Sequence, residues 1–122
     1  MKHHVVSIGI SQHQLAGNNL QYAAKDATEF FKLCTSNLKD IGYSKLLVDS
    51  EATLGQMRSA IGTELLASVS KGDALFFFFS GHGAQGGMAT DPSVALNYLV
   101  PFDAMMTMQK IDVAAIEVAR RG

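Results

Sequence analysis

The sequence predicts an α/β fold in which helices cover both faces of a parallel β-sheet. Three short apolar runs have the composition of buried strands. Between them lie two segments whose apolar residues recur every three or four positions, as in amphipathic helices. This alternation of strand and helix requires right-handed crossovers, which place helices on both faces of one sheet. The expected architecture is a doubly wound, three-layer sandwich.

Three segments are predicted to be strands. Residues 5–10 (VVSIGI) form a β-rich apolar run that suits burial on both faces. Residues 45–49 (KLLVD) follow as a second short strand. Residues 74–79 (ALFFFF) are the most apolar stretch of the chain, so they are predicted to form a central strand of the sheet.

The two segments between these strands are predicted to be helices. Residues 24–38 carry an apolar stripe at helical spacing, and Gly42 is expected to end that helix. Thr53, followed three residues later by Gln56, matches the capping box that begins a helix. The apolar stripe of this second helix runs over residues 54–69.

The remainder of the chain has weaker patterns. Residues 81–87 are predicted to form a glycine-rich loop, residues 97–101 a short extended segment, and residues 103–108 another loop. Residues 112–120 have the spacing of a last helix.

Composition places the chain among globular proteins and excludes several functional classes. Its 122 residues suit one domain, residues 1–122, and 48% of them are hydrophobic. The formal net charge of −1 offers no basic surface for nucleic acid or for an anionic membrane, so the expected partners are proteins or peptides. The apolar run at 5–10 is too short for a signal peptide, and a single cysteine excludes an internal disulfide framework. Both features favour a cytoplasmic location.

The loop that follows the most apolar strand is the first candidate for a functional site. Ligands of open parallel sheets gather at the carboxyl ends of the strands, and Ser80, Gly81, His82 and Gly83 hold that position here. Because glycines shield their neighbours little, His82 is a candidate general base. Two other interpretations stay open, namely a structural turn and a phosphate cradle over residues 81–87. The cradle is the weaker one, since this loop matches no nucleotide-binding fingerprint.

Residues 73–83 (DALFFFFSGHG) resemble the histidine strand and loop of caspases, paracaspases and metacaspases, the peptidase C14 family. Three further segments resemble the family in the same order: residues 5–10, residues 25–27 (KDA) and residues 98–103 (YLVPFD). The resemblance covers most of the chain. It implies the three-layer caspase-hemoglobinase fold.

The resemblance also implies a reaction and a site. His82 would assist a cysteine thiolate that attacks a peptide carbonyl, and Gly83 would lend its backbone N–H to the oxyanion hole. Asp26 and Ser80 match the residues that line the metacaspase pocket for the substrate residue before the cleaved bond, which favours Arg or Lys there. Lys25 stands where metacaspases usually have asparagine and would partly neutralise this pocket. Asp26 has a simpler alternative role, an interaction with the dipole of its helix.

The sequence departs from the family at its C-terminal end. The family's nucleophile lies in an Asp-Ala-Cys-His-Ser-Gly-like segment after the helix that residues 112–120 would form, and these 122 residues contain no such segment. Cys34, on the apolar stripe of the first helix, is expected to pack as a small hydrophobe. We therefore expect this chain to be the N-terminal portion of the domain and to be inactive alone.

An incomplete domain implies a partner. In the expected strand order, residues 5–10 lie between the other two strands, so the outer edge of residues 76–79 would pair with a fourth strand. The expected partner is the C-terminal part of the same domain or a self-associating copy. The alternative function is that of a catalytically dead caspase homologue that binds or scaffolds other proteins.

Metal and the remaining histidines complete the expectations. The resemblance makes calcium a possible cofactor, and Asp91, Asp103 and Asp112 are available acids, but none is assigned as a ligand and the metal stays open. His3 and His4 are expected to be exposed at a frayed terminus. His13 lies near the predicted cleft and is expected to be a solvated loop residue.

Overall fold

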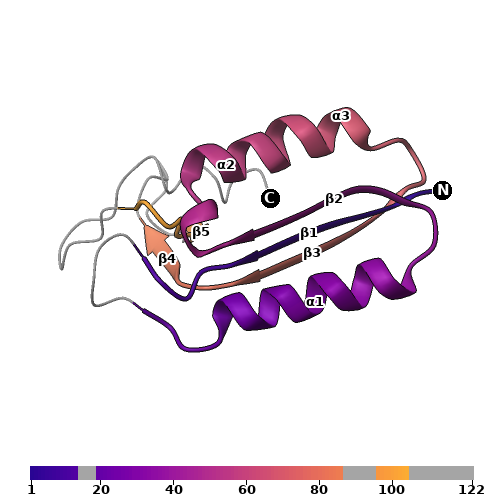
Figure 1. The fold of residues 1–122 in the computed structure, drawn as a ribbon. Coiled ribbons are helices and arrows are strands. Elements are labelled where there is room, and N and C mark those ends of the chain that lie inside the picture. Colours follow the sequence, from indigo (N-terminus) through magenta and orange to yellow (C-terminus); the bar gives the residue numbers. More distant parts are fainter. Residues whose placement is uncertain (14–18, 87–95, 105–122) are drawn as a thin grey trace.

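The computed structural model describes residues 1–13, 19–86 and 96–104, and these confirm an α/β fold with a parallel sheet. The strand order is β2-β1-β3, so the first strand lies between the other two, as expected. Helix α1 covers one face of the sheet, and the helical segment from α2 to α3 covers the other (Figure 1). The elements are β1 (His3–Gly9), α1 (Ala23–Asn37), β2 (Ile41–Val48), η1 (Asp49–Glu51), α2 (Leu54–Ser59), η2 (Ala60–Leu65), α3 (Leu66–Ser68), β3 (Ala74–Ser80), β4 (Gly83–Gly86) and β5 (Leu96–Leu99).

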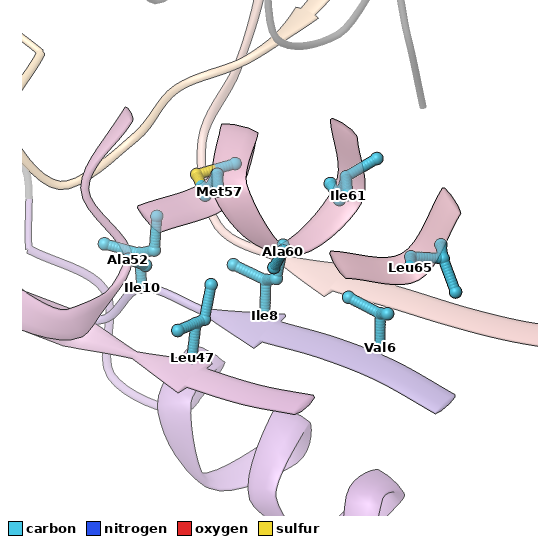
Figure 2. Packing of buried hydrophobic residues seen from close by; sticks show 9 residues of the cluster. All are labelled: Val6, Ile8, Ile10, Leu47, Ala52, Met57, Ala60, Ile61 and Leu65. Carbon is cyan, nitrogen blue, oxygen red and sulfur yellow. The ribbon is translucent and has the colours of Figure 1, made fainter. Parts of the chain in front are cut away.

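Strand β1 is buried on both of its faces, as the apolar run predicted. Every residue from Val5 to Ile10 is buried. On the α2 side, side chains from β1, β2 and the helical segment form the main core (Figure 2). The buried members of that cluster are Val6, Ile8, Ile10, Leu47, Ala52, Met57, Ala60, Ile61 and Leu65.

The second predicted helix is helical over nearly its full predicted length, but it is not uniform. The Thr53 hydroxyl oxygen accepts a hydrogen bond of 3.2 Å from the Gln56 N–H, which caps α2 as predicted. From Ala60 to Leu65 the segment is π-helical, and α3 then ends at Ser68. Its buried residues still follow the predicted stripe.

Helix α1 approaches β1 closely on the opposite face. The Ser7 hydroxyl donates a 2.7 Å hydrogen bond to the carbonyl oxygen of Ala27, which satisfies a buried side chain at the helix–strand contact. A Cβ atom at Gly9 would lie 2.5 Å from the Cβ of Ala27 and would also overlap the carbonyl oxygen of Ala23. The absence of a side chain at Gly9 therefore allows the helix to pack at this distance.

The N-terminus is ordered, so the expectation of an exposed, frayed pair of histidines is wrong. His4 is fully buried, and its Nδ1 accepts a 2.9 Å hydrogen bond from the Tyr43 N–H. Its Nε2 therefore carries the proton and donates to Asp73 at 2.8 Å. Asp73 also accepts from the backbone N–H groups of Lys2 and Ser70. Hydrogen bonds from His4, Lys2 and Ser70 hold the pKa of Asp73 well below its usual range.

Gly42 does not end the first helix. Helix α1 ends at Asn37, and Gly42 lies inside β2, which begins four residues before the predicted strand. A Cβ atom at Gly42 would lie 2.5 Å from Cε1 of His4. The glycine thus makes room for a buried ring that comes from another strand, which a local helix-stop rule does not consider.

The glycine-rich segment after β3 is partly a strand, which corrects the prediction of a loop over residues 81–87. Strand β4 pairs antiparallel with β5, from Gly83 opposite Leu99 to Gly86 opposite Leu96. Strand β5 confirms most of the extended segment predicted at residues 97–101. Because β4 is part of a paired ribbon, the segment is not the open cradle that a phosphate site needs.

Strand β3 lies at an edge of the sheet that the structure describes, whereas its composition predicted a central strand. Leu75, Phe76 and Phe77 are 49%, 36% and 37% exposed, so the most apolar run of the chain is only partly covered. Residues 105–122, which include the last predicted helix, and most of the loop predicted at 103–108 lie outside the described residues. None of the helices in the described ranges is long and apolar enough to cross a membrane.

We predict that Gly9→Ala lowers the free energy of unfolding by about 1–3 kcal/mol, because the new Cβ would force α1 away from β1. Urea denaturation followed by circular dichroism measures the change. Gly62→Ala is the matched control, since no atom lies within 4 Å of the added Cβ in η2. That variant should gain up to about 1 kcal/mol from helix propensity. A neutral Gly9→Ala would contradict the close contact.

We also predict that Asp73→Asn destabilises the protein in a manner that depends on pH. The pKa of Asp73 is lower in the folded than in the unfolded chain, where it is about 3.9. The stabilising contribution is therefore fully present above that value and is lost as the pH falls through it towards the folded pKa. Urea denaturation should show a larger gap between wild type and Asp73→Asn at pH 7 than at pH 3.

A matched control for this prediction is Asp40→Asn. Asp40 is exposed and has a φ of 53°, a left-handed conformation that asparagine also tolerates. Its removal should leave stability nearly unchanged at both pH values. An Asp73→Asn gap of equal size at pH 7 and pH 3 would show that the charge of Asp73 contributes nothing.

Candidate functional site

The candidate site lies at the carboxyl ends of β1 and β3, at the end of the sheet away from the N-terminus (Figure 1). Gly9 is the register partner of Ser80, and the Ile10 N–H donates to the Ser80 carbonyl at 2.9 Å. The two chain segments that leave these strands therefore start side by side. One leads to His13 and the other to His82.

His82 is half-buried just beyond β3. Its backbone carbonyl accepts a 3.1 Å hydrogen bond from the Val100 N–H, which ties its main chain to the end of β5. The backbone on both sides of His82 is thus held, by β3 before it and by the β4–β5 ribbon after it. A histidine on such a fixed backbone suits general acid–base chemistry, which needs a defined position of the imidazole.

The backbone N–H of Gly83 points away from β5. Gly83 is paired with Leu99. The neighbouring residues, Val100 and His82, are joined by a hydrogen bond from the Val100 N–H to the His82 carbonyl. In an antiparallel ladder this pattern makes Gly83 and Leu99 a pair that does not exchange hydrogen bonds. The Gly83 N–H is therefore directed towards the outer side of the ribbon, one residue after His82.

Asp26 and Ser80 lie at the same end of α1 and β3. The rings of Phe30 and Phe78 are stacked, with centroids 4.8 Å apart, which fixes the helix against the strand. Asp26 lies one turn before Phe30, about 6 Å along the helix. Ser80 lies two residues after Phe78, about 6.6 Å along the strand in the same direction, since α1 runs antiparallel to β3. The first turn of α1, which carries the exposed Asp26, thus lies over the end of β3.

The segment after β1 folds inward, and the expectation that His13 is solvated is wrong. One oxygen of the Asp49 side chain accepts from the N–H groups of Ser11 and Gln12, at 2.8 and 2.9 Å. The Ser11 hydroxyl in turn accepts from the Ala24 N–H at 2.8 Å, at the start of α1. These bonds turn the chain so that His13 is only 8% exposed, with its ring centroid 5.2 Å from that of His82.

Burial and a second imidazole both act on His13. Desolvation, followed by the nearby charge of His82, lowers the pKa of His13. The backbone carbonyl of Pro101 and the Asp49 carboxylate oppose that shift. The net direction is downward, so His13 is neutral at pH 7.

The segment that follows β5 is attached to the beginning of α2. The Leu54 N–H donates to a side-chain oxygen of Asp103 at 2.9 Å, and the Phe102 N–H donates to the Ala52 carbonyl at 2.8 Å. These bonds position Val100 and Pro101, both fully buried, beside the two histidines. Asp103 is therefore engaged as a cap for a helix. Asp91 and Asp112, the other acids considered for calcium, lie outside the described residues, which contain no group of three potential metal ligands.

Cys34 is buried in α1, as predicted from its apolar stripe. Burial raises the pKa of its thiol, which favours the protonated and unreactive form. It lies in the last turns of α1, whereas the candidate site lies at the first turn of that helix. Cys34 therefore lacks both the position and the ionisation of a nucleophile.

His13 is the residue of this site that sequence reasoning undervalued. Its position after β1 was visible, and strands that neighbour each other in a parallel sheet deliver their following loops to one place. Residues 5–10 and 74–79 were expected to be neighbouring strands. That expectation already implied that the loops carrying His13 and His82 start close together. What could not be seen was the Asp49 carboxylate that turns the loop inward.

Comparisons with known proteins bear on the fold of the chain as a whole. The family model for the caspase domain matches residues 2–116. The crystal structure of protein GSU0716 from Geobacter sulfurreducens is similar to this chain with a TM-score of 0.68 and 20% sequence identity. The similarity covers 97% of this chain but only 44% of that one, so it shows a shared fold over less than half of the longer protein. No curated protein matches the chain at a significant level.

Proposed function

This chain belongs to the caspase-domain family of cysteine peptidases, and from that membership we propose that it supplies the histidine side of an endopeptidase site. The observation that carries the proposal is the position of His82, half-buried at the carboxyl end of β3 on a backbone held from both sides. In this proposal His82 is the acid–base partner of a cysteine thiolate. That cysteine comes from outside these 122 residues, because Cys34 is buried with a raised pKa.

The proposed reaction has two stages. The thiolate attacks the peptide carbonyl carbon and forms a C–S bond, while the His82 imidazolium gives its proton to the leaving amine as the C–N bond breaks. Neutral His82 then takes a proton from water, whose oxygen attacks the thioester and releases the acid and the thiolate. In both stages negative charge develops on the former carbonyl oxygen. The outward N–H of Gly83 is the proposed donor to it.

Asp26 and Ser80 are the proposed specificity residues. Support comes from the Phe30–Phe78 stack, because Asp26 lies one helical turn from Phe30 and Ser80 lies two residues from Phe78, towards the same end of the sheet. A carboxylate and a hydroxyl suit an Arg or Lys side chain before the cleaved bond. The Nζ atom of Lys25, which was expected to neutralise part of this pocket, lies 4.0 Å from a carboxylate oxygen of Glu29.

The proposed partner is the remaining part of a caspase domain or a second copy of this chain. The half-covered apolar residues Leu75, Phe76 and Phe77 on β3 favour such a partner, because an apolar strand edge is usually covered in a native protein. In this proposal the 122-residue chain binds but does not cleave until the cysteine is supplied.

We predict that the chain alone hydrolyses neither an Arg-ending nor an Asp-ending fluorogenic peptide. The chain joined to the C-terminal part of a caspase domain, with its nucleophilic cysteine, is called the longer protein below and should cleave the Arg peptide. His82→Ala in that longer protein should lower kcat/KM by roughly 10²–10⁴-fold, the usual contribution of a general acid–base group.

Cys34→Ser in the longer protein is the control, and it should retain activity because Cys34 lies away from the site. Turnover by the purified 122-residue chain that vanishes in His82→Ala would contradict the need for an external cysteine. Silence of both forms on both peptides would contradict the peptidase function and favour a homologue that binds or scaffolds partners.

We predict further that Asp26→Asn lowers kcat/KM for the Arg peptide by about tenfold or more, because a hydrogen-bonded charge pair is lost. Glu29→Gln is the matched control, since Glu29 is an exposed carboxylate one turn away on the same helix. It should change kcat/KM little. Equal losses in the two variants would indicate a general effect of charge, and the pocket role of Asp26 would be wrong.

A further inference from the structure

We infer that His13 is a positioning residue for His82. The neutral imidazole of His13 offers its Nε2 as the hydrogen-bond acceptor for an N–H of the His82 ring. The role in catalysis rests on the proposed function of His82. The contact itself rests on the position of the two rings and can be tested without turnover.

The first observation is a buried nitrogen that lacks a partner. His13 is more than nine-tenths buried, and among the described residues its Nε2 has no hydrogen-bond partner. Buried polar atoms are nearly always paired, because an unpaired one forfeits its hydration without compensation. An unpaired nitrogen beside a candidate catalytic histidine therefore indicates a bond that forms when the site works.

The second observation fixes the tautomer of His13. The backbone of Pro101 forms a hydrogen bond with the His13 ring that raises its pKa. Proline has no backbone N–H, so the Pro101 group is a carbonyl oxygen that accepts a hydrogen bond from a ring N–H. Because Nε2 has no partner, the donor is Nδ1–H. Neutral His13 then carries its proton on Nδ1 and its lone pair on Nε2, which is an acceptor only.

The spacing of the rings suits a direct bond. With an N–H hydrogen bond of about 2.9 Å, two imidazoles joined through nitrogens have ring centres about 5 Å apart. The centroids of His13 and His82 lie 5.2 Å apart, at an angle of 49° between the ring planes. The proposed bond requires the His82 side chain to turn so that one of its ring nitrogens faces Nε2 of His13.

The surroundings of His13 favour its neutral form. The titratable groups that act on His13 are His82 and Asp49, and the Asp49 carboxylate already accepts from two backbone N–H groups. Burial disfavours a charged His13. In the proposed pair His13 is therefore the neutral member, and its Nε2 stays available as an acceptor. The bond to His13 also directs the other His82 nitrogen towards the thiolate.

The first experiment is a long-range ¹H–¹⁵N NMR titration of the histidine rings in the 122-residue chain. We expect His13 to remain a neutral Nδ1–H tautomer over the pH range in which His82 titrates. A His13 that carries its proton on Nε2, or that becomes charged before His82, would overturn the inference. This measurement needs no substituted protein.

Two variants test the bond itself. In His13→Phe the ring volume is kept and the acceptor is lost, so the titration midpoint of His82 should move to lower pH. In His13→Gln the side-chain carbonyl oxygen replaces Nε2, so the midpoint should return towards that of the wild type. His3, which bonds the Lys39 carbonyl at the other end of the sheet, is the internal reference and should not shift. An unchanged His82 midpoint in His13→Phe would overturn the inference.

The same variants in the longer protein separate this inference from the proposed function. His13→Phe should lower kcat by about tenfold to a hundredfold with KM unchanged, because a misoriented base costs on that scale, and His13→Gln should recover most of the loss. A longer protein that cleaves peptides while His13→Phe leaves both kcat and the His82 midpoint unchanged would overturn the positioning role alone. A silent longer protein in which the His82 midpoint still shifts would overturn the peptidase function and leave the His13–His82 bond established.

Discussion

The pairing of β1 along both of its edges is the constraint on which the rest of this structure depends. Because β2 and β3 flank it and helices cover both faces, nearly every residue of the strand is buried. A strand fixed on four sides has one possible register, and that register sets Gly9 beside Ser80. The loops that carry His13 and His82 start from these two neighbours. The register of β1 and β3 therefore determines where the site begins.

The site is then assembled by side chains that satisfy backbone N–H groups. Asp49 holds the loop that bears His13, and Asp103 holds the segment that contains Pro101. Each acid satisfies donors that would otherwise be unpaired at the end of a strand or helix. Two acids to which the sequence analysis gave no role at the site, Asp49 and Asp103, thus help to determine where the two imidazoles lie.

Sequence reasoning located the features that depend on local patterns. The continuous apolar runs predicted β1 and β3 closely, and the position of His82 followed from the end of a strand. It failed where a distant partner decides the outcome. His4 is buried because Asp73 lies 69 residues away in sequence but in contact with it. Gly42 lies in β2, where the absence of a side chain leaves room for the His4 ring. Strand β4 is paired with β5, which follows it later in the sequence.

The contacts between β1 and β3 also bear on the order of folding. The strands β1 and β2 are joined by one helix, whereas the bond between Lys2 and Asp73 spans 71 residues. Closing the longer loop costs more chain entropy and follows the nearer pairing. During synthesis, β1, α1 and β2 leave the ribosome before β3 can add to them. His82 therefore reaches His13 only late in folding, and a nascent chain carries an incomplete site until most of this segment has emerged.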